Sequence, residues 1–215
     1  MLIHKFENDS TSYFMDEKGV FFRRMVGGLG WPGPMADGFA VVVAEEYREW
    51  PPLGRHRLFL MAEREAREVS QLLKMAADLQ GEFKIQPSDW FGQATNNPMK
   101  SELDLFNRES PHIYIKDAPD IEHPRVLEKY LRLIRELLNP DKKTLLLSTE
   151  ENLLKDHHLP QIDEIELKEA KIEDQPAIVA LGAAVTALEY RPFVDHTQYH
   201  RLRKELLDRY DVEDV

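Results

Sequence analysis

Apolar positions in the first half of the chain fall into short runs that predict β-strands. Residues 13–24 form a hairpin pattern, because apolar positions flank a polar turn that contains Gly19, and residues 26–31 continue in extended form. Residues 38–46 include the apolar run Phe-Ala-Val-Val-Val, which is typical of a central strand covered on both faces. Further strands are expected at 56–62, 83–91, 112–115 and 144–147.

Apolar residues also recur at helical spacing between and after these strands. This spacing predicts helices at 65–80, ended by Gly81, and at 97–107, 124–138, 175–189 and 199–210. The stretch 177–188 is apolar almost throughout, which indicates a buried core helix. Successive strands followed by alternating helices and strands predict an α/β fold, a mixed β-sheet flanked by helices on both faces.

Composition narrows the class of protein. With 215 residues, 42% of them hydrophobic and 31% charged, the chain suits one globular domain, with an N-terminal hairpin and a peripheral C-terminal helix. It has no cysteine, which excludes disulfides and thiolate chemistry and suits a reducing compartment. No apolar run reaches the roughly 20 residues that span a bilayer, so we expect a cytoplasmic protein. The net charge of −11 repels a phosphate backbone unless basic residues cluster on one face.

Acidic residues at two places in the sequence could carry chemistry. Asp89 lies at the end of the strand expected at 83–91, and the carboxyl ends of open-sheet strands commonly bind ligands. Glu173 and Asp174 precede the apolar helix, where a carboxylate can point at a metal. Structural interpretations compete with these. Asp89 could be a turn residue that bonds its own backbone, and Asp174 could be an N-cap worth about 1 kcal/mol.

Three early segments and these acids occur in a recognisable order. The segments are Gly-Leu-Gly-Trp at 28–31, Gly-Phe-Ala-Val-Val-Val at 38–43 and Arg-Leu-Phe-Leu at 57–60. Asp89 follows, and Glu-Asp-Gln-Pro-Ala-Ile-Val-Ala-Leu closes the series at 173–181. The order resembles the RNase H-like nuclease domain of phage large terminases over roughly residues 27–188. No Gly-rich loop ending in Gly-Lys-Ser or Gly-Lys-Thr is present, so the ATPase half has no counterpart.

The resemblance implies a metal-dependent mechanism. Clustered carboxylates in such a domain bind two divalent metals, which activate a water for phosphodiester cleavage. Asp89 and Asp174 would be metal ligands, Glu173 a further catalytic candidate, and Mg²⁺ or Mn²⁺ the cofactor. The family's first strand ends in an aspartate that bridges the metals, but Gly30 or Trp31 holds that place here. The metal site implied by the resemblance is therefore incomplete.

The missing acid and the acidic charge together favour a degenerate, non-catalytic relative of that nuclease. It would be a binding or structural component linked to phage DNA packaging, in the host cytoplasm or associated with the virion. Its expected partners are phage packaging or assembly proteins, and no membrane. Two alternatives stay open. One is an active divalent-metal-dependent DNA nuclease whose third ligand is Asp37 or Glu173. The other is an acidic assembly or adaptor protein that docks on a basic partner.

Aromatic residues near the candidate acids also have two interpretations. Trp31, Trp90 and Phe91 could stack on nucleic-acid bases. Packing in the core is the commoner outcome for such residues.

Overall fold

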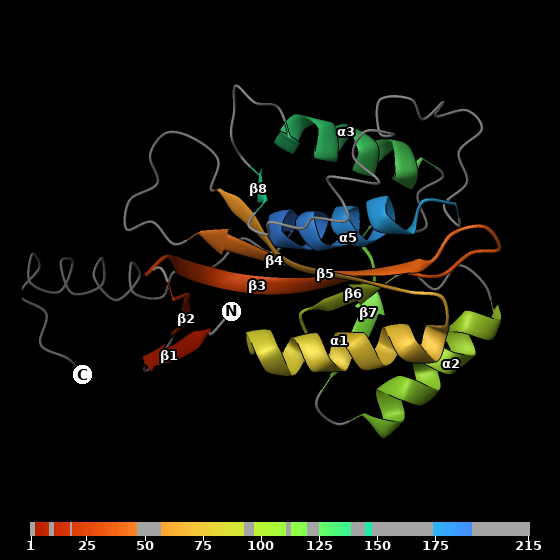
Figure 1. Ribbon diagram of the computed structural model, residues 1–215, viewed down its shortest axis with the longest axis horizontal. Coiled ribbons are helices and arrows are strands. Elements are labelled where there is room, and N and C mark those ends of the chain that lie inside the picture. Colours follow the sequence, from red (N-terminus) through yellow and green to blue (C-terminus); the bar gives the residue numbers. More distant parts are fainter. Residues whose placement is uncertain are drawn as a thin grey trace, which may run out of the picture.

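The computed structural model describes most of the predicted sheet and its covering helices (Figure 1). The described residues are 3–8, 11–17, 19–46, 57–92, 97–110, 113–119, 125–138, 145–147 and 174–190. Glu173 and the helix expected at 199–210 lie outside these ranges. Within them, no helix is long and apolar enough to cross a membrane.

Eight strands form one mixed sheet in the described part of the chain. They are β1 (His4–Asn8), β2 (Thr11–Met15), β3 (Phe21–Gly30), β4 (Gly38–Glu46), β5 (Leu58–Ala66), β6 (Trp90–Gly92), β7 (Ile115–Asp117) and β8 (Leu145–Leu147). The first five pair antiparallel in chain order. β6 then pairs parallel with β3, β7 parallel with β6, and β8 parallel with β5. The predicted mixed sheet is confirmed, and β1 is a strand that the sequence pattern did not predict.

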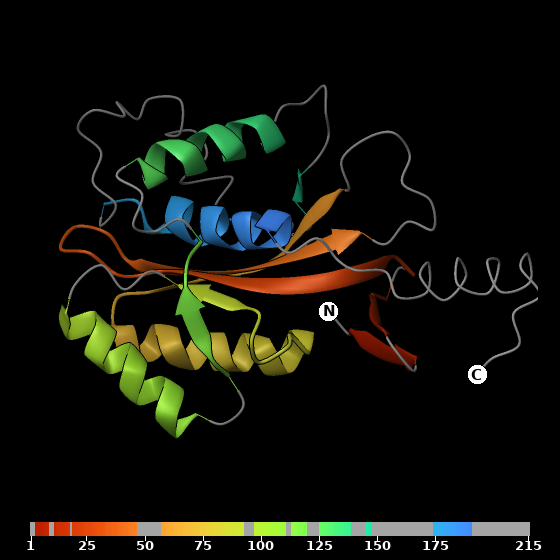
Figure 2. The same cartoon turned by 180° about the vertical axis from the view of Figure 1, so that it is seen from behind.

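Helices cover both faces of this sheet, as predicted. One face carries α1 (Val69–Phe83) and α2 (Asn97–Glu109), and the other carries α5 (Pro176–Tyr190) with α3 (Val126–Leu138) outside it. Figure 2 shows the same layers from behind, with α5 between the sheet and α3. We call the two cores the α1-face core and the α5-face core. The sheet separates them.

The two helices of the α5 face differ in pattern because they occupy different layers. Every residue from Ala177 to Leu188 is buried, since α5 contacts the sheet on one side and α3 on the other. α3 is amphipathic: residues such as Leu131 and Ile134 are buried, while Arg132 is exposed. The uniformly apolar stretch thus corresponds to the middle layer, as expected for a buried helix.

Glycines allow the helix backbone to lie directly on the strand backbone. A Cβ built at Gly28 would lie 2.0 Å from the carbonyl oxygen of Ala180, and one at Gly30 would lie 1.9 Å from that of Pro176. On the other side of α5, a Cβ at Gly182 would lie 2.3 Å from the ring of Tyr130. Neither interface has room for even one methyl group.

The boundaries predicted around the first crossover are wrong. β5 extends to Ala66, so α1 begins at Val69 rather than at residue 65. Gly81 lies inside α1, and the helix ends instead at Phe83, where Lys84 takes the left-handed conformation with φ of 54°. The strand expected at 83–91 is consequently reduced to Trp90–Gly92. Tertiary packing of Phe83 and Ile85 in the α1-face core outweighs the local signal of Gly81.

We predict that Gly28→Ala destabilises the protein strongly. The added methyl group meets the α5 backbone, which cannot rotate away as a side chain does, so we expect a loss of about 3 kcal/mol or more, the upper part of the overpacking range. Chemical denaturation measures it. Gly81→Ala is the matched control: nothing lies within 4 Å of its Cβ, and the helical position should gain about 0.5–1 kcal/mol. Equal stabilities would contradict the close approach of α5 to β3.

Candidate functional site

Asp89 lies at the amino end of β6, not at the carboxyl end of a strand as the sequence pattern suggested. Its N–H donates to the carbonyl of Gln86 at 2.9 Å, within the turn that precedes the strand. Its own carbonyl accepts from the N–H of Gly27 at 2.9 Å and so starts the parallel pairing with β3. The correction follows from the longer α1, which leaves only Trp90–Gly92 as strand.

The carboxylate of Asp89 forms a bidentate ion pair with Arg24 of β3. Arg24 Nη2 lies 2.7 Å from Oδ1, and Arg24 Nε lies 3.3 Å from Oδ2. Only 12% of the Arg24 side chain and 10% of the Asp89 side chain are exposed. Both oxygens therefore face a guanidinium in a largely buried place. A metal ion at Asp89 would have to replace Arg24.

Asp174 stands just outside the start of α5. The carbonyl of Gln175 accepts the N–H of Val179 at 3.1 Å, which is the first hydrogen bond of the helix, and Pro176 is the first helical residue. Gln175 is therefore the N-cap. The expectation that Asp174 caps the helix is wrong by one residue, and its side chain is exposed.

The structure does not bring Asp89 and Asp174 together. α5 runs antiparallel to β3, with Pro176 over Gly30 and Ala180 over Gly28. Gly27, which bonds Asp89, lies three residues from Gly30, or about 10 Å along the strand. The Asp89 carboxylate pairs with Arg24, which is three residues further from Gly30 than Gly27 is. Asp174, in contrast, precedes Pro176, the α5 residue that lies over Gly30. Metal ions that share ligands stand about 3.5–4 Å apart, so these two positions are too distant to share one.

The place expected for the first-strand acid is closed. Gly30 has the carbonyl of Pro176 directly above it, and Trp31 is buried in the α1-face core, on the other side of the sheet. Asp37 lies exposed in the β3–β4 loop. Among the described residues, no group of three or more His, Asp or Glu side chains is arranged to hold a metal ion.

The aromatic residues are core residues rather than stacking platforms. Trp31, Trp90 and Phe91 are all buried, and Trp90 is fully so. The Trp90 ring occupies the space above Gly27, where a Cβ would lie 2.2 Å from it. Gly27 thus leaves space for the Trp90 ring on the α1 face, as Gly28 and Gly30 leave space for the α5 backbone on the other face.

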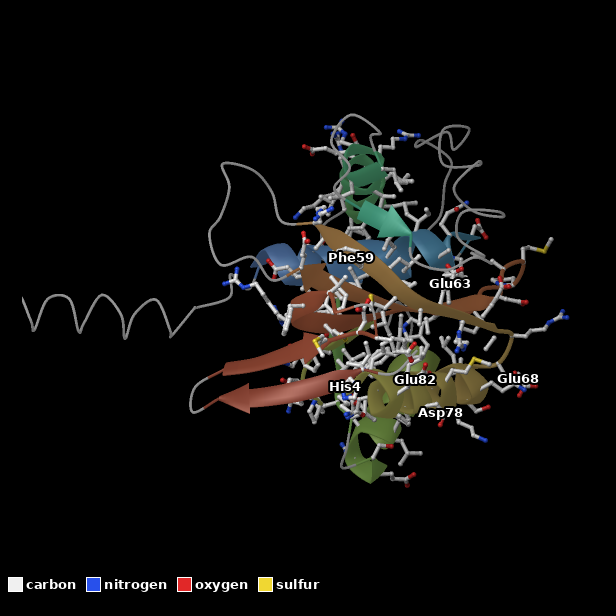
Figure 3. All side chains as sticks on the ribbon, turned by 60° about the vertical axis from the view of Figure 1, so that its left-hand side comes forward. His4, Phe59, Glu63, Glu68, Asp78 and Glu82 are labelled. Atoms are coloured by element: carbon white, nitrogen blue, oxygen red, sulfur yellow. The ribbon has the colours of Figure 1, made fainter. Side chains whose placement is uncertain are left out.

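Sequence reasoning missed two charged residues that the fold buries. Arg24 pairs with Asp89 across 65 positions of sequence, and no pattern in its neighbourhood indicates this partner. Glu63 of β5 is 5% exposed and lies opposite Val41, which belongs to the α5-face core. Figure 3 shows Glu63 on β5 and Asp78 and Glu82 on α1, across the sheet from it. These acids therefore do not form one cluster, and the only local signal for Glu63 is that it directly follows the apolar run of β5.

Comparisons with known proteins identified no relative of this chain. No protein-family model matches the chain, and neither the curated proteins nor the solved structures compared with it show a significant match.

We predict that Asp89→Ala costs about 3–5 kcal/mol of unfolding free energy. It leaves the charge of Arg24 largely buried without its bidentate partner, and breaking a buried pair has this cost. Thermal and denaturant unfolding would measure it. Glu128→Ala is the control, because its partner Arg132 is 74% exposed and such helical pairs contribute only about 0.3–0.5 kcal/mol. Similar losses in the two variants would contradict a special role for the Arg24–Asp89 pair.

We predict that Asp174 contributes little to stability and binds no magnesium that matters for folding. Asp174→Ala and Asp174→Asn should both stay within about 0.5 kcal/mol of the parent, as exposed residues outside a cap generally do. Added Mg²⁺ should leave the melting temperature of the parent unchanged, because a ligand stabilises only the state that binds it. A magnesium-dependent rise that is lost in both Asp174→Asn and Asp89→Asn would show a working metal site.

Proposed function

We propose that this chain is an RNase H-like domain that has lost catalysis and serves as a binding or structural component of phage DNA packaging. The strand order supports the RNase H-like part of the proposal, the closed first-strand position supports the loss of catalysis, and the net charge supports the role with protein partners.

The order of strands supports the RNase H-like assignment. The resemblance covers three early strands, a fourth strand near Asp89 and a closing helix against the sheet. Here β3, β4 and β5 are antiparallel, α1 follows, and β6 returns beside β3 in parallel. β7 extends this edge after α2, and α5 covers the face opposite α1. Two crossovers to parallel strands and one closing helix in this order favour the assignment over other mixed sheets.

The observation that carries the loss of catalysis is the backbone contact at Gly30. A metal-bridging aspartate at the end of β3 needs space between the strand and the start of α5. A Cβ at Gly30 would stand 1.9 Å from the carbonyl oxygen of Pro176, so the position admits neither the side chain nor the ion. The site is thus closed by packing, and not merely short of one ligand.

Charge supports a protein partner rather than DNA. The chain carries a net charge of −11, and Arg24, the basic residue that contacts Asp89, is committed to that ion pair. Phosphate binding gains its affinity from free Lys and Arg side chains gathered on one surface. We therefore place the proposed role with packaging or assembly proteins of the phage, to which an acidic surface contributes orientation and association rate.

A cleavage assay tests the proposal. We predict that the purified protein leaves supercoiled plasmid intact with Mg²⁺ or Mn²⁺, and that Gly30→Asp does not restore cleavage because the new side chain cannot fit. Co-purification with the packaging proteins of the same phage, weakened by salt, is expected of the binding role. Metal-dependent cleavage by the parent that Asp89→Ala abolishes would overturn the non-catalytic assignment. Failure to co-purify with any packaging protein would overturn the packaging role.

A further inference from the structure

Strand β7 forms one outer edge of the sheet in the described part of the chain. It pairs with β6 on one side only. Tyr114 N–H donates to the Pro87 carbonyl and Ala118 N–H to the Gly92 carbonyl, so these two residues direct their backbone groups inward. Because backbone groups alternate along a strand, Ile115 and Asp117 direct theirs outward. An outward N–H and C=O on one residue are what a further strand would bind.

The side-chain amide of Asn107 occupies this binding position at Ile115. Ile115 N–H donates to Asn107 Oδ1 at 2.8 Å, and Asn107 Nδ2 donates to the Ile115 carbonyl at 2.8 Å. One amide thus makes the same pair of hydrogen bonds that a residue of a neighbouring strand would make. Asn107 stands on α2, which lies beside β7 (Figure 2).

We propose that Asn107 is an edge-blocking residue, which prevents β7 from pairing with the corresponding strand of a second copy of this chain. A second copy is the relevant occupant because it presents the same β7 edge. A two-fold axis beside β7 would bring Ile115 and Asp117 of the two chains into antiparallel register. Tyr114, which directly precedes Ile115 in β7, has a side chain that is 52% exposed. Once opened, the edge would therefore have both hydrogen-bonding groups and apolar surface to offer.

The choice of asparagine fits this role. Only an amide side chain has a donor and an acceptor side by side, so aspartate would satisfy the Ile115 N–H but repel its carbonyl. Alanine would leave both groups open. The proposal concerns association of the folded chain and does not depend on the proposed packaging function.

Sedimentation velocity over a range of concentrations tests the proposal. Asn107→Ala should shift the chain toward dimers or larger species as concentration rises, relative to the parent under the same conditions. Asn107→Ala combined with Asp117→Pro is the matched control. Asp117 is exposed and its N–H points outward, so proline removes a donor needed for strand addition without disturbing the β6 pairing. The double variant should sediment like the parent.

Hydrogen exchange of the Ile115 amide shows whether the edge has opened, so an unchanged sedimentation profile can be interpreted. Loss of one hydrogen bond should speed exchange of this amide roughly tenfold in Asn107→Ala at low concentration. If exchange rises but the sedimentation profile stays that of the parent, the edge opens without pairing and the proposal is wrong. If Asn107→Ala fails to fold, Asn107→Asp decides in its place, because it keeps the bond to the Ile115 N–H. Association of that variant, reversed by Asp117→Pro, supports the proposal, and an unchanged profile overturns it.

Discussion

The direct contact between the backbones of α5 and β3 is the constraint on which the rest of the structure depends. A helix usually packs on a sheet through side chains from both elements. Here Gly28 and Gly30 present no side chain, so the carbonyls of Ala180 and Pro176 lie on the strand itself. The contact buries apolar surface without voids, which close-packed interiors require. It also means that no residue other than glycine can stand at either position while α5 stays where it is.

This constraint extends outward through the layers. α5 is covered by α3, and their contact again needs glycine, with the Tyr130 ring against Gly182. The hydroxyl of Tyr130 donates to the Pro119 carbonyl at 2.8 Å, which fixes the ring and ties α3 to the segment that follows β7. A shift of α5 that made room for an acid and a metal ion at Gly30 would therefore have to move α3 as well. Because packed interfaces of this kind resist gradual deformation, the closed position at Gly30 is a property of the whole α5 face.

The sequence predicted those elements whose signal is local and left out those that depend on distant partners. Residues 38–46 were predicted to their exact bounds, because β4 is buried on both faces and its apolar run has no competing interpretation. The buried helix was found within one residue for the same reason. The end of α1 was missed because Gly81 suggests a stop, while the core contact of Phe83 that carries the helix further is not a local feature. The Arg24–Asp89 pair could not be predicted, since nothing near Asp89 in sequence indicates which of several arginines the topology places beside it.

Asp89 also shows that an acidic residue can have a structural role in this sheet that requires no metal ion. On the edge of β3 away from β4, β2 pairs only with Phe21 and Phe22, and β6 begins at Gly27. Between them, among the described residues, β3 has no strand partner on this edge. Asp89 lies at the end of that interval and bonds β3 twice, through its carbonyl to Gly27 and through its carboxylate to Arg24. A charged pair with nearly complete bidentate geometry offsets much of its desolvation cost, and its directionality fixes where β6 joins the sheet. An aspartate at this position is therefore expected on structural grounds alone, which is why its presence does not by itself indicate catalysis.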